Sequence, residues 1–335
     1  MNKKQLDKAF ETFRNLNVLI IGDVMVDSYV WGKVTRVSPE APVPIVAVNK
    51  KENRLGGAAN VALNVQALGA TPILCSVIGV DKDGDLFLNL MKEQKLSPKG
   101  ILKSRDRITT NKTRVIGNNH QLLRVDEEKE NDITKSETQQ LLRIILYLLK
   151  TEKVNVVIFE DYDKGLITQS LITKVVAEAK RKKIPVVVDP KKRNFANYKN
   201  VTLFKPNLKE MKEGIKWDFD SFNKKQLQQA VTTFREKQNI DIALITLSEQ
   251  GLYVDDGTEK KLIPAMVRNI ADVSGAGDTV ISVAALCLAA DLDPISIATI
   301  TNLAGGQVCE KVGVVPVKRK QLYKEALQLI KQKAL

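Results

Sequence analysis

The segment DVSGAGDTVISVAA, residues 272–285, holds the residues of this sequence best suited to chemistry. Gly275, Ala276 and Gly277 directly precede the carboxylate of Asp278, and an apolar run typical of a helix follows. Small residues let a ligand approach the backbone, and the first N–H groups of a helix have no partner within it. With the helix dipole, these amides could neutralise a transferring phosphoryl group while Asp278 accepts a proton from the attacking hydroxyl. An ordinary glycine-rich helix cap explains the same residues, so the hypothesis needs support elsewhere.

That support comes from polar residues that gather directly after apolar, strand-like runs. The clusters are Asp23 and Asp27 after 17–22, residues 161–165 after 154–160, residues 189–193 after 185–188, Asn207 and Glu210 after 201–206, and residues 248–251 after 242–247. In a parallel sheet, all these clusters lie at the carboxyl ends of the strands, which is where α/β proteins bind ligands. Any one of these clusters could be an ordinary polar loop. Because all of them are expected at the same edge of the sheet, we favour a single ligand-binding site there.

The elements that must position these residues alternate along the chain. Strands are predicted at 17–22, 72–79, 154–160, 185–190, 201–206 and 242–247, and helices at 56–70, 134–150, 168–182 and 224–237. The runs VNVVIFE (154–160) and PVVVDP (185–190) are mainly apolar and do not alternate, as expected of strands buried on both faces. We therefore predict an α/β fold with a mostly parallel central sheet and helices on both faces. Neither repeats nor a linker interrupt the pattern, so residues 1–335 are expected to form one domain.

Two segments, at about 28–50 and 107–126, depart from this alternation because apolar and polar residues follow one another within them. The second contains Gly117-Asn118-Asn119, a typical hairpin turn. We predict a small β layer that stands off the main sheet and serves as a lid over a ligand or as a dimer contact.

Composition limits the class of protein. A formal net charge of +13 suits anionic ligands, but the basic residues are scattered and the nine Phe are not interleaved with them, which argues against nucleic acid. The three cysteines and the single His120 cannot form a zinc site or a His-dependent hydrolase centre. The start of the chain resembles an amphipathic helix and not a signal peptide, and we expect a cytoplasmic protein that does not enter a membrane.

The motifs that carry a family resemblance are Gly56-Gly57 with Asn60, Asn207-x-x-Glu210, and Asp272-x-x-Gly275-Ala276-Gly277-Asp278, in that order. They resemble those of the ribokinase/PfkB carbohydrate kinases over essentially the whole chain. Within that family, SPEAPVP (38–44), EDYDKG (160–165) and DPKKRNFANY (189–198) are most similar to the D-glycero-β-D-manno-heptose-7-phosphate kinases of ADP-heptose (lipopolysaccharide core precursor) biosynthesis. The resemblance implies a ribokinase-like fold with a small β lid.

The resemblance also implies roles on the sugar side of the site. Asp278 would be the catalytic base, with the amides of Gly275, Ala276 and Gly277 as its anion hole. The residues expected to bind the phosphosugar are Asp27, Gly57, Asn60, Arg124, Asp161, Lys164 and Lys191. Among these, Lys164, Lys191 and Arg124 are the candidates for the sugar's own phosphate, and the choice among Lys191, Lys192 and Arg193 stays open.

On the nucleotide side, the resemblance implies ATP and Mg²⁺. Asn207 and Glu210 would organise the triphosphate, with Glu210 reaching Mg²⁺ through water. The residues expected along the nucleotide are Ser248, Gly251, Gly275, Gly277 and Asn302. Asp272 belongs to a loop where many family members hold a monovalent cation such as K⁺, although Ser274 stands where threonine is common.

The function that these expectations imply is ATP-dependent phosphorylation of the anomeric hydroxyl of D-glycero-β-D-manno-heptose 7-phosphate to the 1,7-bisphosphate. A related kinase acting on a fructose or tagatose phosphate is the alternative within the family. A non-catalytic nucleotide-binding protein is the alternative outside it. Bifunctional relatives carry a nucleotidyltransferase domain whose H-x-G-H motif needs two histidines, so we expect that domain to be absent here. A homodimer formed through the lid is also expected.

Overall fold

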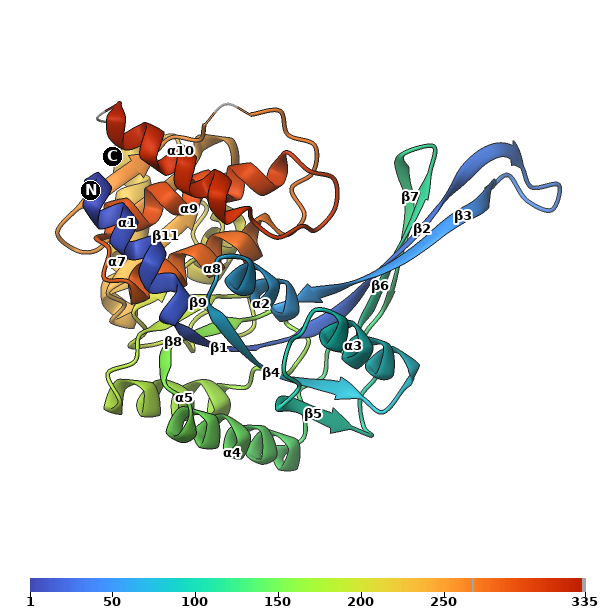
Figure 1. Ribbon diagram of the computed structural model, residues 1–335, viewed down its shortest axis with the longest axis horizontal. Coiled ribbons are helices and arrows are strands. Elements are labelled where there is room, and N and C mark those ends of the chain that lie inside the picture. Colours follow the sequence, from blue (N-terminus) through green and yellow to red (C-terminus); the bar gives the residue numbers. More distant parts are fainter. Residues whose placement is uncertain (267, 333–335) are drawn as a thin grey trace.

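The computed structural model describes residues 1–266 and 268–332, and its centre is a nine-stranded sheet (Figure 1). The strand order is β13-β12-β11-β10-β9-β8-β1-β4-β5, and all neighbours pair in parallel except β11 with β12 and β12 with β13. The strands are β1 (Asn17–Gly22), β4 (Thr71–Gly79), β5 (Gly100–Ser104), β8 (Val154–Glu160), β9 (Val186–Asp189), β10 (Leu203–Phe204), β11 (Ile242–Thr246), β12 (Leu252–Asp255) and β13 (Lys260–Ile263).

Helices cover both faces of this sheet, and the side chains of each strand alternate between two separate cores. In β1, Val18 and Ile20 face one core while Leu19 and Ile21 face the other. The first core is covered by α1 (Lys3–Thr12), α2 (Ala58–Ala67), α3 (Lys82–Glu93), α8 (Ala276–Ala289), α9 (Pro294–Cys309) and α10 (Arg319–Lys331). The second is covered by α4 (Lys135–Thr151), α5 (Gln169–Arg181), α6 (Leu208–Ile215) and α7 (Lys224–Gln238). The predicted fold class is therefore confirmed.

Two predicted elements differ from the structure by more than one residue at an end. The helix expected at 56–70 begins only at Ala58, because Gly56 and Gly57 end strand β3 and Gly57 has a φ of 59°. The strand expected at 201–206 is regular only over Leu203–Phe204, although the amides of Thr202 and Lys205 still donate to the carbonyls of Val186 and Val188. The antiparallel strands β12 and β13 were not predicted.

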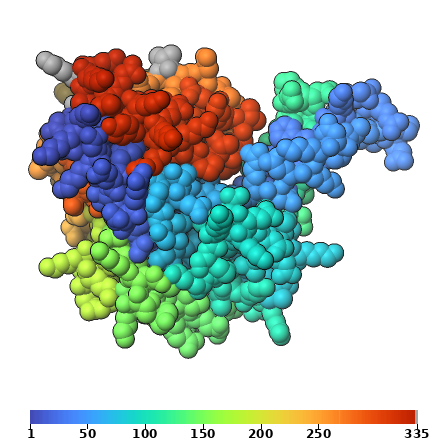
Figure 2. All heavy atoms as spheres, in the orientation of Figure 1, coloured from blue at the N-terminus to red at the C-terminus, as the bar shows by residue number. Residues whose placement is uncertain are grey.

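A second, four-stranded sheet projects from the body as an arm (Figures 1 and 2). Its strands are ordered β3-β2-β6-β7, and they are β2 (Val24–Val37), β3 (Pro44–Gly57), β6 (Asn111–Gly117) and β7 (His120–Glu127). Asn118 and Asn119 form the β6–β7 turn with φ values of 52° and 67°, the left-handed conformation that asparagine tolerates and that two-residue hairpin turns require. The arm contains most of the two segments expected to form a separate β layer.

Cys75, Cys287 and Cys309 are buried and free of disulfides, as their apolar surroundings in the sequence suggest. Across residues 1–266 and 268–332, no helix combines the length and apolarity that crossing a bilayer requires.

Asn64 joins three parts of the first core. Its amide oxygen accepts from the Thr279 hydroxyl of α8 at 3.1 Å and from the backbone amide of Val317 at 2.9 Å. Its amide nitrogen donates to the Asn60 carbonyl at 3.0 Å, within α2. One fully buried side chain thus fixes α2 against α8, the two helices that carry Asn60 and Asp278.

We expect Asn64→Ala to lower the free energy of unfolding by about 2–4 kcal/mol, because it leaves the Val317 amide without its acceptor and opens a small cavity between α2 and α8. Urea denaturation followed by circular dichroism measures the change. The matched control is Gln66→Ala on the same helix, whose side chain bonds only the Gln94 carbonyl near the surface, and which should cost less than about 0.5 kcal/mol. Equal losses in the two variants would contradict the assigned role.

Candidate active site

The N-terminus of α8 is the centre of the candidate site. Gly275 precedes the helix with a φ of 77° and supplies no side-chain cap, so the amides of the first turn face the partly exposed surface at 275–277. A side chain at Gly275 would be strained, and its Cβ would lie 2.9 Å from the amide nitrogen of Asn60. The Ala276 amide donates to the Val273 carbonyl at 3.2 Å, so one of the three predicted anion-hole amides is already engaged within the loop.

Asp278 is buried in the first turn of α8, and both of its carboxylate oxygens accept short hydrogen bonds. The Asn60 amide nitrogen of α2 donates to Oδ2 at 2.6 Å, and the Tyr162 hydroxyl donates to Oδ1 at 2.6 Å. Burial raises the pKa of Asp278 above its usual range, and these two donors partly offset that rise. The carboxylate is therefore oriented, shielded from water and more basic than an exposed aspartate.

Three charged side chains lie side by side at the strand ends next to Asp278. Glu160 and Asp189 are paired across β8 and β9, so they share one face of the sheet. Lys205, which follows β10, forms a buried ion pair with Asp189 at 2.6 Å between Nζ and Oδ2. Both atoms of this pair would lie 3.6 Å from a Cβ placed on Gly277, which puts the pair beside the first turn of α8.

Within the described residues, Glu160 Oε2 and Asp189 Oδ1 are buried without a hydrogen-bond partner. Burial, reinforced by the charges of Asp189 and Asp278, raises the pKa of Glu160 well above its usual range. Burial lowers the pKa of Lys205, but Asp189, Glu210 and Glu160 outweigh that effect and the net pKa is raised. Lys205 therefore stays cationic among carboxylates, close to where the sequence predicts phosphate.

Glu210 and Asn207 form a reciprocal cap at the start of α6. The Asn207 side chain accepts from the Glu210 amide at 2.8 Å, and Glu210 Oε2 accepts from the Asn207 amide at 2.8 Å. Glu210 Oε1 contacts the Nζ of Lys191, which also lies 5.7 Å from the centre of the Tyr162 ring. Burial lowers the pKa of Lys191, but the carboxylates of Asp189, Glu210 and Glu160 outweigh this effect, and the net pKa is raised. The structure thus groups Lys191 with a residue expected on the nucleotide side.

The base of the arm carries the residues expected to bind the sugar. Asp27 of β2 is buried and forms an ion pair with Arg114 of β6 at 2.5 Å between Oδ1 and Nη1. Arg114 and Arg54 both lie against the ring of Tyr29, at 5.3 and 4.9 Å from its centre. Gly57 ends β3 and opens directly into α2, which carries Asn60. Arg114 was not among the predicted site residues.

Two predicted phosphate-binding cations are engaged by carboxylates of the chain. Lys164 Nζ contacts Glu128 at 2.8 Å and Glu130 at 2.7 Å. Arg124, in β7, is half exposed and contacts Asp126 at 2.8 Å. Arg124 pairs directly with Arg114 across β6 and β7, so the two side chains share one face of the arm.

Asp161 lies apart from the other predicted residues because its carboxylate faces the protein interior. Its Oδ2 accepts from the Tyr198 hydroxyl at 2.9 Å and from the Asn194 amide at 3.2 Å, and Oδ1 accepts from the Asp163 amide at 2.9 Å. Burial and the neighbouring charge of Asp23 raise the pKa of Asp161 to about 7. These contacts shape the loop after β8.

The residues expected along the nucleotide lie around the start of α6 and the turn at 248–251. Ser248 and Asn207 line an open cavity of about 840 Å³ together with Lys209, Lys212 and Trp217. Gly251 closes the turn, since its carbonyl accepts from the Leu247 amide at 2.8 Å. The Asn302 side chain of α9 donates to the Pro264 carbonyl at 2.8 Å, on the loop that follows β13.

Asp272 fixes the loop that leads into α8. Its Oδ1 accepts from the Ser274 amide at 2.9 Å and its Oδ2 from the Gly313 amide at 2.8 Å. Burial would raise the pKa of Asp272, but these backbone donors outweigh it and the pKa is lowered. Both oxygens therefore hold the loop through its backbone amides.

In the part of the chain that the structure describes, no three His, Cys, Asp or Glu side chains are placed to hold a metal ion together. The carboxylates nearest the start of α8 are nevertheless hard oxygen donors that suit Mg²⁺ when phosphate and water supply the remaining ligands.

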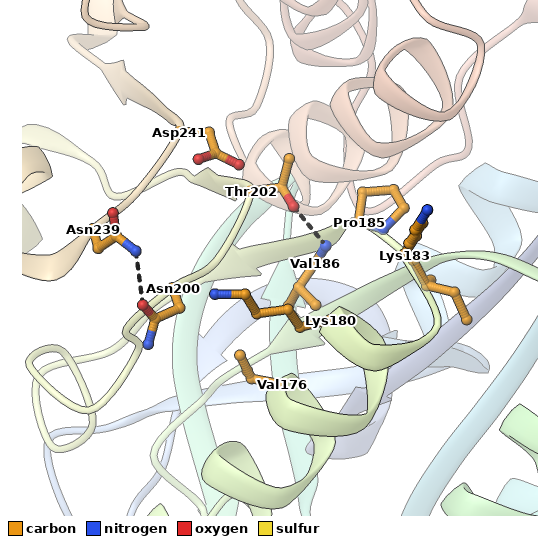
Figure 3. A pocket seen from close by; sticks show the side chains of 10 residues that line it. Val176, Lys180, Lys183, Pro185, Val186, Asn200, Thr202, Asn239 and Asp241 are labelled. Carbon is orange, nitrogen blue, oxygen red and sulfur yellow. Dashed lines mark hydrogen bonds between the residues drawn. The ribbon is translucent and has the colours of Figure 1, made fainter.

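A separate cavity of about 310 Å³ lies at the opposite edge of the sheet, near the amino ends of β9, β10 and β11 (Figure 3). Lys180, Lys183, Thr202 and Asp241 line it, and Asn239 donates to Asn200 at 2.8 Å across its rim. None of the predicted site residues lines this cavity, so it is distinct from the candidate active site.

Sequence reasoning missed four groups that the geometry brings to the site: Tyr162, Glu160, Lys205 and Arg114. Glu160 and Lys205 could have been found, because each stands at the carboxyl end of a predicted strand. Tyr162 was visible in the cluster after 154–160, but only the fold shows that its hydroxyl reaches Asp278.

Comparison with known proteins gives the same architecture and a family. The pfkB family carbohydrate kinase profile matches residues 15–320. Two solved structures similar to this chain are phosphofructokinase-2 from Escherichia coli in complex with potassium (TM-score 0.77, 15% identity) and ribokinase from Arabidopsis thaliana complexed with ribose and ATP (TM-score 0.70, 16% identity). Each match covers 94% of this chain and 99% of the other, and at this identity it shows the fold alone.

Sequence relatives are more similar. The chain is 38% identical over 317 residues to the bifunctional protein HldE of Magnetococcus marinus, and 37% identical over 321 residues to that of Geobacter sulfurreducens. These matches cover 94% and 95% of this chain but only 65% and 64% of the relatives, so the chain spans slightly less than two thirds of their length. With the profile matching nearly the whole sequence, the chain belongs to the pfkB family of carbohydrate kinases.

Proposed function

We propose that the protein uses ATP and Mg²⁺ to phosphorylate the anomeric hydroxyl of D-glycero-β-D-manno-heptose 7-phosphate, forming the 1,7-bisphosphate. The observation that carries the proposal is the buried, doubly hydrogen-bonded Asp278 in the first turn of α8. The choice of sugar rests on the motifs at 38–44, 160–165 and 189–198 and on relatives named bifunctional protein HldE. The proposal covers phosphoryl transfer alone.

In the proposed reaction, Asp278 accepts the proton of the acceptor hydroxyl as that oxygen attacks the terminal phosphorus of ATP, and the bond from this phosphorus to the bridging oxygen breaks to release ADP. The first-turn amides of α8 and the ammonium groups of Lys205 and Lys191 neutralise charge on the transferring group. Glu210 would hold Mg²⁺ through water, and the ion would supply charge neutralisation at the phosphates. The pair of Glu210 and Lys191 thus belongs to the phosphoryl-transfer side of the site.

The acceptor would lie between α8 and the base of the arm. The hydroxyls of the acceptor would be bound by Asp27, Gly57 and Asn60. Of these, Asn60 lies within hydrogen-bond distance of the base, Asp278. Arg114 and Arg124 share one face of the arm and are the cations that we assign to the sugar's phosphate. Lys164 is linked to the arm through Glu128, which also contacts Lys112 of β6. This assignment moves Lys191 away from the sugar phosphate, where sequence reasoning had placed it.

The nucleotide would follow Asn207, Ser248, Gly251 and Asn302 from the start of α6 toward α9. A monovalent cation such as K⁺ would bind carbonyl oxygens of the loop that Asp272 holds. ATP supply and three buried free thiols support a cytoplasmic reaction.

The arm supports a proposed homodimer. Its exposed apolar side chains are Val37, Val43, Val48, Leu122, Leu123 and Val125. Apolar residues gathered on a projecting β layer are typical of a surface that another chain covers. Two arms packed together would bury these side chains and enclose the sugar.

Substrate choice can be tested by an ADP-release assay across a panel of sugars. We expect heptose 7-phosphate to exceed unphosphorylated heptose and the fructose and tagatose phosphates by at least about tenfold in kcat/KM, because cations of the arm recognise the phosphate. ³¹P NMR should place the new phosphate on the anomeric carbon. A fructose or tagatose phosphate as the best substrate would refute the proposed sugar, and ATP binding without turnover on any sugar would refute the activity.

We expect Asp278→Asn to lower kcat by at least about a hundredfold while ATP binding, measured by calorimetry, changes little, because the amide cannot accept the proton. The control is Asp85→Asn, which removes an exposed carboxylate of α3 and should leave kcat unchanged. Wild-type turnover in Asp278→Asn would exclude this carboxylate as the base.

The position of Lys191 generates a second kinetic prediction. Lys191→Gln should lower kcat by about a hundredfold and raise KM for ATP more than KM for the phosphosugar, because Lys191 contacts Glu210 on the phosphoryl-transfer side. The neighbouring Lys192 is exposed, and Lys192→Gln should change neither constant more than about twofold. A selective rise in KM for the phosphosugar would instead restore the sequence-based assignment.

A further inference from the structure

Tyr162 is the side chain through which the loop after β8 reaches the candidate base. Its hydroxyl lies 2.6 Å from Asp278 Oδ1 and donates to it, while Asn60 donates to Oδ2 from the opposite helix. Tyr162 lies in the 160–165 motif between Asp161 and Asp163, and its hydroxyl contacts the Asp278 carboxylate directly.

The loop that carries Tyr162 is held by two buried carboxylates. Asp23, directly after β1, accepts from the amides of Tyr162 at 3.0 Å, Lys164 at 3.2 Å and Leu166 at 3.1 Å. Asp161 holds the same loop through Tyr198 and Asn194. These hydrogen bonds restrict the backbone of the loop, so the Tyr162 side chain is held in a defined position next to Asp278.

We propose that Tyr162 is a positioning residue for the general base, holding the Asp278 carboxylate in one orientation and keeping it ionised in its buried setting. A carboxylate can accept about four hydrogen bonds, so Tyr162 and Asn60 leave acceptor capacity for the incoming hydroxyl. The inference deepens the proposed function, since it takes Asp278 to be the base. It adds a residue that acts through Asp278 without touching the reacting atoms.

The charges around Asp278 explain why such a donor is needed. The carboxyl groups of Asp189 in β9 and Glu160 in β8 lie near Asp278 and disfavour its negative charge. The ammonium group of Lys205, after β10, favours that charge, and Tyr162 adds a neutral hydroxyl donor. Burial raises the pKa of Asp278, and the hydrogen bond from Tyr162 is the largest effect that lowers it. Burial, with the charges of Asp278 and Glu160, also raises the pKa of Tyr162, so the phenol remains a donor throughout the working range.

Removing the hydroxyl should make Asp278 easier to protonate. In Tyr162→Phe, we expect the pKa of Asp278 to rise by about one to two pH units, the size of a lost hydrogen bond to a charged group. The measurement is ¹³C NMR titration of labelled aspartate carboxylates in the free enzyme, with the Asp278 signal assigned by its absence in Asp278→Asn. This titration requires no sugar, so it separates the present inference from the proposed function.

The matched control is Tyr323→Phe, which removes a tyrosine hydroxyl that donates to the Asp7 carboxylate at 2.6 Å, between α10 and α1. It should leave the Asp278 titration unchanged. If Tyr162→Phe does not fold, 3-fluorotyrosine incorporated at position 162 keeps the ring and strengthens the donor, and the pKa of Asp278 should then fall. An unchanged titration in either variant at position 162 would overturn the inference.

The pH dependence of kcat/KM gives a second readout on whichever sugar the enzyme prefers. Asp278 must be deprotonated to act as a base, so activity is lost as pH falls through its pKa. In Tyr162→Phe, this loss of activity at low pH should shift to a pH that is higher by the same one to two units, and turnover should largely recover at alkaline pH. A loss of activity that is equal at every pH, with the limb in place, would show a merely structural role.

Discussion

The carboxylate of Asp278, buried at the start of a helix, is the constraint on which the rest of the site depends. A charge removed from water is costly unless nearby groups hydrogen-bond to it, and Asp278 is almost fully buried. Its two donors come from α2 and from the loop after β8, so three separate elements must meet with hydrogen-bond precision. Asn64 fixes the first of these elements against α8, and Asp23 fixes the loop. Much of the buried polar network near α8 therefore serves one side chain.

Three charged side chains lie next to the start of α8, at the carboxyl ends of neighbouring strands. Glu160, Asp189 and Lys205 follow or end adjacent strands and occupy the space where apolar residues fill the rest of the sheet. Buried ion pairs of this kind contribute little to stability compared with apolar packing. The ion pair of Asp189 and Lys205 lies beside the first turn of α8, which fits the proposed phosphoryl transfer.

The fold class and most of its elements could be predicted because their causes are local. The strands at 17–22 and 154–160 have the predicted limits, since their continuous apolar runs are bounded by residues that favour loops. Gly56 and Gly57 misled the prediction because two glycines fit a helix entrance as well as a strand end. The partner of Lys191 could not be predicted, because Glu210 lies 19 residues away and reaches it only through the packing of β9 against β10. The same holds for Tyr162 and Asp278, which are 116 residues apart.

The arm has a consequence for how the site is assembled. Asp27 and Arg114 belong to its sheet, whereas Asp278 belongs to the body, so the two halves of the proposed acceptor site lie on separate layers. Arg54, near the root of β3, donates to the Val314 carbonyl, and the adjacent Gly313 amide is held by the Asp272 loop that leads into α8. Orientation of the arm and geometry at the helix entrance are thus mechanically linked. A contact that holds the projecting sheet in place would therefore change the affinity for the proposed acceptor, even if that contact lies far from the nucleotide.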